Sequence, residues 1–283
     1  MSASTLNTIE SANQRYLNTL EERWNKSILE WAIPENILSE FKTSPFRLDP
    51  STFSPDEPSA TDRRLEIIKE TLRDRGNNDS TVVANLTLID VGAGAGSSLA
   101  PIRSPFKQVT CVEEASHMCQ ALQQNLANMY ETASMYRIVQ GRFPEVAKDI
   151  EPANVVNCSN VIYNVTDPAK FIRTLNDLAT DLVILEATIR HPFYRTNDAF
   201  KHFWNLERPV TPTITDVFEI TTALHYEPYL ESLPSTYRRG VMSLEGVAQR
   251  LGLDETRLPE LQRYVENNPM PENPSVLIWW RKQ

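Results

Sequence analysis

The middle of the chain alternates between short apolar segments and longer amphipathic ones. The apolar, β-branched runs, which have the composition of strands covered on both faces, lie at about 86–91, 109–113, 136–140, 154–159 and 181–187. The segments with helical spacing between them lie at about 96–103, 116–132 and 168–179. This alternation predicts an α/β fold: a doubly wound, mostly parallel sheet with helices on both faces, whose ligands bind at the carboxyl ends of the strands.

Further helices are expected on both sides of this region. Before it, residues 8–31 carry one apolar stripe, a polar connector covers 43–60, and a second helix opens at 59–62 and ends near Gly76. After it, the expected elements are a helix at 213–224, a strand at 225–233, helices at 243–251 and 254–267, and a last strand at 275–280. We expect an N-terminal helical cap, 1–58, and a main domain, 59–283, with insertions at about 188–212 and 234–274.

Composition and charge narrow the possible partners. The 283 residues are 41% hydrophobic and 23% charged, as is usual for a soluble enzyme. The net charge of -9 and the lack of a long Lys/Arg cluster argue against nucleic acid as substrate. No apolar run has membrane-spanning length, and no signal peptide is visible. Three scattered cysteines suit neither a metal site nor a disulfide framework, so we expect a cytoplasmic protein.

The most informative segment is a glycine-rich turn after the first predicted strand. Gly92, Gly94 and Gly96 are three of only eight glycines in the chain, and they follow Asp90 at the end of an apolar run. Glycine inside a strand or helix is destabilising, so this concentration indicates a sharp strand-to-helix turn that lies against a ligand. Ser97 stands where a dinucleotide fingerprint has its third glycine, and no Lys-Ser or Lys-Thr pair follows, which excludes a nucleoside triphosphate loop.

The run 90–96, Asp-Val-Gly-Ala-Gly-Ala-Gly, closely resembles the first motif of class I S-adenosylmethionine-dependent methyltransferases. The resemblance extends over about residues 60–190 and includes the last strand, which fits the reversed seventh strand of that fold. It implies S-adenosylmethionine as cofactor, with the glycine turn under its methionine part. It also implies that Glu113, at the end of the second strand, accepts hydrogen bonds from the ribose hydroxyls, with Glu114 as the alternative.

Several further positions would then face the cofactor. Asp90 would order the loop near the amino end of the cofactor, or cap the loop without touching it. Arg142 stands where relatives often have an acid that holds the adenine amino group, and Phe143 would pack on the ring or in the core. The residues predicted to bind the cofactor are Asp90, Gly92, Ala93, Gly94, Gly96, Glu113, Glu114, Arg142, Phe143 and Asn157.

Catalytic residues are expected at the carboxyl ends of the fourth and fifth strands. Asn160 and Tyr163 follow the fourth strand, where the methyl group should lie, but the Asn/Asp-Pro-Pro-Tyr/Phe motif of some amino-methyltransferases is absent. Asn160 also suits a structural amide. His191 follows the fifth strand, and we expect it to act as a base or substrate contact, or to be a turn histidine held by its neighbours.

These features predict a methyltransferase that acts on a small molecule by in-line methyl transfer. The aromatic residues in the first helix and in 188–212 suit an apolar or planar acceptor, while Arg190, Arg195 and Arg208 weakly suggest an anionic or carbonyl-bearing one. Alternatives are a protein or RNA methyltransferase, a non-catalytic scaffold or regulatory protein that keeps the cofactor fold, a non-methylating use of the cofactor and, more distantly, a dehydrogenase. The sequence does not indicate an oligomeric state.

Overall fold

The computed structural model describes residues 3–42, 44–45, 62–74, 86–103, 106–234 and 243–282. The predicted connector 43–60 and the expected opening of the second helix at 59–62 lie almost wholly outside these ranges, and so does the predicted end of that helix near Gly76.

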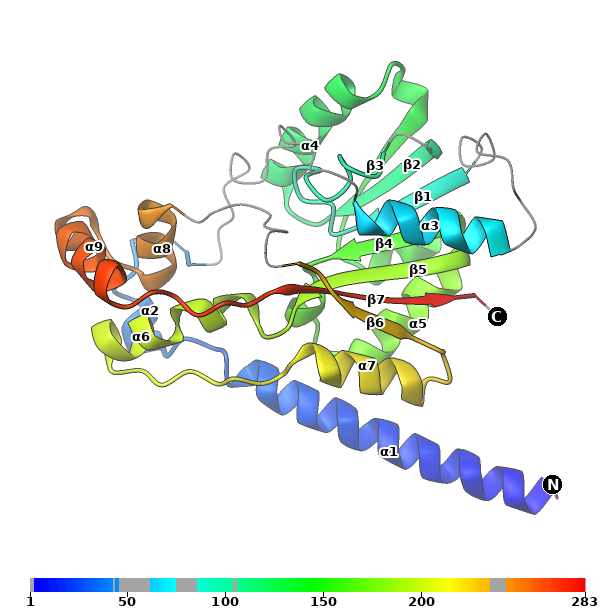
Figure 1. The fold of residues 1–283 in the computed structure, drawn as a ribbon, viewed down its shortest axis with the longest axis horizontal. Helices are drawn as coiled ribbons and strands as arrows, with labels where there is room; N and C mark the ends of the chain where they lie inside the picture. Colours follow the sequence, from blue (N-terminus) through cyan, green and yellow to red (C-terminus); the bar gives the residue numbers. More distant parts are fainter. Residues whose placement is uncertain are drawn as a thin grey trace.

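One mixed sheet forms the centre of the described part of the chain (Figure 1). Its seven strands are β1 (Leu86–Val91), β2 (Phe106–Glu113), β3 (Tyr136–Gln140), β4 (Ala153–Ser159), β5 (Ala179–Thr188), β6 (Tyr229–Ser232) and β7 (Ser275–Arg281). They lie in the order β3-β2-β1-β4-β5-β7-β6. The first five strands pair in parallel, and β7 is antiparallel to both β5 and β6. The predicted fold class is confirmed, including the reversed last strand.

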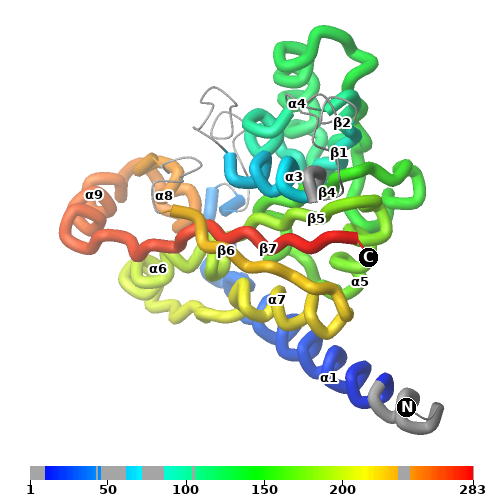
Figure 2. The backbone as a smooth tube through the Cα atoms, turned by 45° about the vertical axis from the view of Figure 1, so that its right-hand side comes forward, coloured from blue at the N-terminus to red at the C-terminus, as the bar shows by residue number. Residues whose placement is uncertain are grey.

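Helices cover both faces of this sheet. They are α1 (Ala3–Leu29), α2 (Glu35–Leu38), α3 (Arg63–Asp74), α4 (Ser116–Met129), α5 (Pro168–Leu178), α6 (Asn197–Trp204), α7 (Ile214–Ala223), α8 (Leu244–Leu251) and α9 (Leu258–Asn267). One face packs against α1, α5 and α7, and the other against α3 and α4, so that a separate hydrophobic core lies on each side (Figures 1 and 2). The alternation of strands and helices in the sequence is what produces these layers.

The N-terminal helix α1 is part of the packing of the domain. Its apolar stripe places Leu17, Leu20 and Trp24 in the same core as β4, β5 and α5, and Figure 2 shows it alongside α7. The Trp24 indole donates a hydrogen bond to the Val165 carbonyl at 2.8 Å, which ties α1 to the loop after β4. Neither α1 nor any other helix in the described ranges combines the length and apolar character needed to cross a membrane.

A third core lies beyond the carboxyl ends of β4 and β5. Residues from α2, α6, α8 and α9 meet there, with Ile37, Phe200 and Leu251 among the buried members. In Figure 1 these helices form a lobe at the left of the sheet. The two predicted insertions and the segment after α1, although distant in sequence, therefore combine into one structure, which we call the helical lobe.

The helix predicted at 96–103 is wrong. Residues after the glycine turn form a series of turns up to Ile102. Pro101 explains the difference, because proline lacks the amide that a helix interior requires and disfavours helical backbone at the residue before it. The glycine turn therefore presents its own amides, without the N-terminus of a regular helix behind them.

Candidate functional site

The glycine turn follows β1 in a left-handed backbone conformation. The φ angles of Gly92, Gly94 and Gly96 are 71°, 54° and 95°, values that residues with a side chain rarely adopt. A Cβ at Gly92 would lie 2.2 Å from a methyl carbon of Val161, so that glycine is needed for packing. A Cβ at Gly94 would meet no atom of the described residues within 4 Å, apart from its neighbours in the chain. The turn therefore faces open space at Gly94, as a backbone that approaches a ligand would.

Glu113, at the end of β2, holds this turn. The Gly94 amide donates to its Oε2 at 2.9 Å, and the Ala115 amide donates to its Oε1 at 2.8 Å. The neighbouring Glu114 is exposed. Glu113 is thus the acid that faces the turn, and its carboxylate lies at the open position beside Gly94.

Asp90 belongs to a polar network buried under the turn. Its carboxylate accepts hydrogen bonds from the Ser98 hydroxyl at 3.1 Å and from the Asn157 amide nitrogen at 2.6 Å. All three residues are buried, so these bonds replace the water that their polar groups lose. The structure therefore brings Asp90 and Asn157, on adjacent strands, into direct contact, and it leaves both beneath the surface.

Arg64 on α3 is the centre of this network, and it was not predicted from sequence. Its side chain is 0% exposed and forms a bidentate pair with Asp62, with contacts of 2.9 and 2.6 Å. It also donates to the oxygens of Asn157 and Ser159 at 3.2 Å, and it lies 3.7 Å from the carboxylate of Glu186 on β5. The sequence does contain a signal for the burial of Arg64, because position 64 lies on the same face of the helix as the buried positions 67, 68 and 71.

The expected adenine contacts lie after β3. Arg142 is exposed, and Phe143 is half-buried. The Phe143 ring packs edge-on against Phe171, with centroids 5.1 Å apart. This contact attaches Phe143 to the core of the sheet face that α5 covers.

Asn160 is the exposed polar residue at the carboxyl end of β4. Its φ of 59° is left-handed, and its backbone N–H donates a hydrogen bond to the backbone carbonyl of Glu186 at 2.7 Å. A residue other than glycine in this region costs free energy and is often found where function requires a side chain in an unusual direction. The structure therefore holds the Asn160 backbone firmly between β4 and β5 and leaves its side chain exposed.

Tyr163 and His191 lie together in a buried aromatic cluster with Trp24 and Trp31. The Tyr163 hydroxyl is shared between two backbone carbonyls, at 2.8 and 3.0 Å, and its ring stacks on Trp24. The His191 ring stacks on Trp31, with centroids 4.1 Å apart, and its Nδ1 accepts from the Phe193 amide at 3.2 Å. Tyr163 belongs to the core on the sheet face that α1, α5 and α7 cover, and its hydroxyl is fully used by the backbone.

The environment of His191 argues against the expected role as a general base. Burial, followed by the charges of Arg208 and Arg250, lowers its pKa from 6.5 to about 3. The ring is neutral at physiological pH, and a group with so low a pKa is a weak proton acceptor. Because Nδ1 accepts a hydrogen bond, the proton of the neutral ring lies on Nε2.

This burial predicts an acid-sensitive contribution to stability. A histidine with pKa about 3 in the folded state and 6.5 when exposed binds more protons in the unfolded chain, so stability should fall as the pH drops through 6.5 toward 3. Relative to wild type, His191→Phe should become more stable on acidification, by up to about 1.4 kcal/mol per pH unit. Urea unfolding at pH 7, 6 and 5 measures this, with the exposed His202 replaced by Phe as the control. If the free energies of unfolding of wild type and His191→Phe changed with pH in the same way, this prediction would be contradicted.

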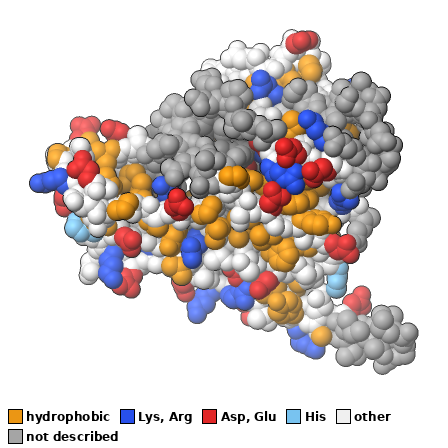
Figure 3. All heavy atoms as spheres, viewed as in Figure 1, with side chains coloured by type: hydrophobic (Ala, Val, Ile, Leu, Met, Phe, Trp, Pro, Cys, Tyr) orange, Lys and Arg blue, Asp and Glu red, His pale blue; other side chains and the backbone are white. Residues whose placement is uncertain are grey.

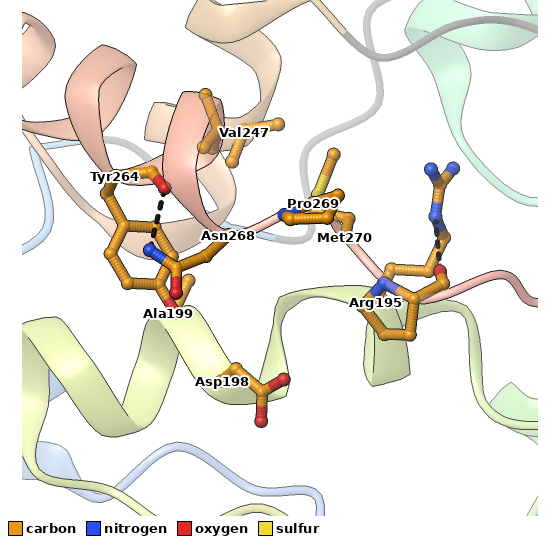
Figure 4. Close-up of a pocket in the computed structure, with 10 residues that line it drawn as sticks. Arg195, Asp198, Ala199, Val247, Tyr264, Asn268, Pro269 and Met270 are labelled. Atoms are coloured by element: carbon orange, nitrogen blue, oxygen red, sulfur yellow. Dashed lines mark hydrogen bonds between the residues drawn. The ribbon is translucent and has the colours of Figure 1, made fainter.

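A small pocket lies in the helical lobe between α6, α8 and α9 (Figure 4). Its lining residues are Arg195, Asp198, Ala199, Val247, Tyr264, Val265, Asn268, Pro269, Met270 and Pro271. The Arg195 side chain, from the short helix η6 (Pro192–Thr196), donates to the Pro271 carbonyl at 3.2 Å. A volume of about 150 Å³ is small beside that of most ligand sites, so this pocket has room for part of a small molecule.

Comparisons with known proteins agree with this geometry. Residues 89–181 match a family model described as a methyltransferase domain, which includes the end of β1, the turn and the strands through the start of β5. No curated protein sequence matches the chain.

Two solved structures illustrate the likeness in fold. Magnesium protoporphyrin IX methyltransferase from Synechocystis, solved with bound SAH, is 12% identical, with 78% of this chain and 82% of that chain covered and a TM-score of 0.50. A sarcosine dimethylglycine methyltransferase, assigned by inference in Galdieria sulphuraria, is 13% identical, with coverages of 78% and 86% and a TM-score of 0.50. Residues 89–181 therefore match a methyltransferase domain, and the glycine turn and the strand order give the chain the fold of class I methyltransferases.

Proposed function

We propose that the chain binds S-adenosylmethionine at the glycine turn and transfers its methyl group to a small molecule. The observation that carries this is the open position at Gly94 beside the Glu113 carboxylate, at the carboxyl ends of β1 and β2. Parallel sheets of this type bind their ligands at that edge. Glu113 would hold the ribose hydroxyls, since a carboxylate offers two acceptor oxygens to a vicinal diol.

The residues around the turn would orient the cofactor. Gly92, Ala93, Gly94 and Gly96 would supply backbone close to it, while Asp90 and Asn157 would support the turn from below through their mutual hydrogen bond. Arg142 and Phe143 remain candidates for the adenine end. The bound cofactor supplies an electrophilic methyl group, so the chain has mainly to align the acceptor and exclude water.

For the transfer itself, Asn160 is the best-placed of the three predicted catalytic residues. Its side chain is exposed at the carboxyl end of β4, where an acceptor would approach the methyl group. We assign Tyr163 and His191 a positioning role, because their buried rings join the loops after β4 and β5 to Trp24 and Trp31. Residues 1–58 would serve as the cap through their later part, where Trp31 and Ile37 contact the helical lobe.

A small acceptor suits the charge of this protein better than a nucleic acid does. The net charge is -9, and on the face shown in Figure 3 acidic and basic side chains are interspersed over the described residues.

The state of the cysteines is compatible with the cytoplasmic location that we propose. All three are free and buried, and burial raises the pKa of the Cys111 and Cys158 thiols.

Glu113, the last residue of β2, and its neighbour Glu114 allow a controlled test of cofactor binding. Titration calorimetry with S-adenosylmethionine should show saturable binding to wild type. Glu113→Gln should weaken that binding by about tenfold or more, because one oxygen that would accept from the ribose diol becomes a donor. Glu114→Gln is the matched control and should bind like wild type. No binding to wild type at millimolar cofactor would reject the proposed function.

Turnover needs a separate experiment, since a scaffold could bind the cofactor without using it. Incubation with methyl-labelled S-adenosylmethionine and a cell extract, followed by separation of small molecules from protein and RNA, should place the label in the small-molecule fraction. Label in protein or RNA would favour a macromolecular acceptor, and cofactor binding without any transfer would favour a regulatory role.

A further inference from the structure

Arg208 is a buried cation without a counter-charge in the described part of the protein. It follows α6 and is 9% exposed. Its Nη2 donates to the Trp31 carbonyl at 2.7 Å, and its guanidinium lies over the rings of Trp31 and Phe200, at 5.2 and 4.7 Å from their centroids. Its Nε and Nη1 are withdrawn from solvent and have no hydrogen-bond partner among the described residues. Two donors of a charged group are therefore left unsatisfied, which costs free energy.

A second arginine lies in the same neighbourhood under similar conditions. Arg250 on α8 is half-buried, and its guanidinium lies 4.9 Å from the centre of the Phe193 ring. Burial lowers the pKa of both Arg208 and Arg250 to about 10, with a further contribution from Arg195 in the case of Arg250. Both side chains are still cationic at neutral pH, and no carboxylate in the described ranges contributes to either pKa.

His191 links the two arginines to the carboxyl edge of the sheet. Its ring packs against Trp31, which lies under Arg208, and against Phe193, which lies under Arg250. It follows the end of β5 by three residues, and its ring packs edge-on against Tyr163 in the loop after β4, with centroids 5.7 Å apart. Arg195, which lines the pocket in Figure 4, adds a third positive charge near Arg250, whose pKa it lowers.

This arrangement is unusual in a protein with a net charge of -9. An apolar side chain of similar volume would avoid the desolvation of a buried charge at little cost in stability. Aromatic contacts and one carbonyl offset part of the cost for Arg208, but neither neutralises its charge. Arg208 is therefore a buried cation whose charge is not neutralised, close to the edge of the sheet where the acceptor is proposed to bind. Such a cation is suited to bind an anion.

We propose that Arg208 and Arg250 bind the carboxylate of the methyl acceptor, so that the substrate class is a small carboxylic acid. The guanidinium groups supply charge and planar donors, a combination that matches a carboxylate well. The surrounding aromatic rings form an apolar wall for the rest of the molecule. The carboxylate serves here as the anchor that positions the acceptor. This proposal rests on the proposed function for the identity of the bound acid as a methyl acceptor.

Anion binding can be tested without turnover, using benzoate as the probe. Calorimetry and thermal unfolding should show that benzoate binds and stabilises wild type, both with and without S-adenosylhomocysteine, because a ligand that binds only the folded state raises its stability. Arg208→Met and Arg250→Met should each weaken benzoate binding by about tenfold or more. Arg263→Met, which alters an exposed arginine on α9, should bind benzoate like wild type.

Two further measurements separate binding from a structural role. If Arg208 is an anion-binding residue, Arg208→Met without ligand should be as stable as wild type or more stable, whereas an Arg208 needed for folding should lose stability on this change. Arg208→Lys keeps the charge and should restore part of the benzoate affinity lost in the Met variant. Equal benzoate affinity in wild type and both Met variants, or no benzoate binding to wild type, would overturn the proposal.

The cofactor measurement keeps the two proposals apart. Arg208→Met should bind S-adenosylmethionine like wild type, because it lies outside the glycine turn. A wild type that binds cofactor but not benzoate would overturn the carboxylate site alone. A wild type that binds benzoate but not cofactor would reject the proposed function and leave the anion site established.

Discussion

Gly94→Ala is expected to reduce S-adenosylmethionine affinity by at least about 100-fold, equivalent to about 2.8 kcal/mol, while the protein stays folded. Apart from its neighbours in the chain, the new methyl group would meet no atom within 4 Å in the part of the protein that the structure describes. It would point into the space that the cofactor is proposed to occupy. Its cost to the unliganded protein should be the left-handed backbone alone, about 1–2 kcal/mol. Calorimetry for binding and urea unfolding for stability measure the two effects.

Gly92→Ala is the matched comparison and should show the opposite balance. Its Cβ would lie 2.2 Å from a methyl carbon of Val161, in addition to the strain of a φ of 71°. The expected loss of stability is about 2–5 kcal/mol, which combines backbone strain with overpacking. If Gly94→Ala bound cofactor as wild type does, the turn would not be the cofactor contact.

Arg64→Met should produce the largest loss of stability, about 3–5 kcal/mol. Arg64 is fully buried, and its replacement would remove the guanidinium that pairs with the buried carboxylates of Asp62 and Glu186. For a chain of this size the loss corresponds to a fall of roughly 10 °C in Tm. Urea unfolding and calorimetric melting at neutral pH measure it.

The neighbouring Arg63 provides the control for this prediction. It pairs with Glu66, Glu70 and Glu231 at the surface, where ion pairs contribute little, so Arg63→Met should cost about 1 kcal/mol or less. Combining Arg64→Met with Asp62→Asn should recover part of the lost stability, because it removes the negative charge of one carboxylate that Arg64 pairs with. Equal losses for Arg63→Met and Arg64→Met would show that burial of the pair is unimportant.

Local patterns predicted the sheet well. The bounds of β1 and β3 agree with those predicted from sequence, and those of β2, β4 and β5 differ by no more than three residues. Short apolar runs bounded by polar turns are reliable here because a covered parallel strand needs side chains that are apolar on both faces. The helix predicted at 96–103 does not form because Pro101 interrupts a helical backbone, whatever the spacing of the apolar residues around it.

Some residues of the site can likewise be predicted from local sequence, whereas others come together only through folding. The glycine turn after β1 and the place of Glu113 at the end of β2 can be predicted from the chain alone, because both depend on residues next to a strand end. That Glu113, and not Glu114, holds Gly94, and that Arg64 lies among carboxylates from distant segments, follows only from the folded arrangement. The burial of His191 and Arg208 also depends on folding. The charge and basicity of such side chains are set by their desolvation and by partners that are distant in sequence, and local patterns contain neither.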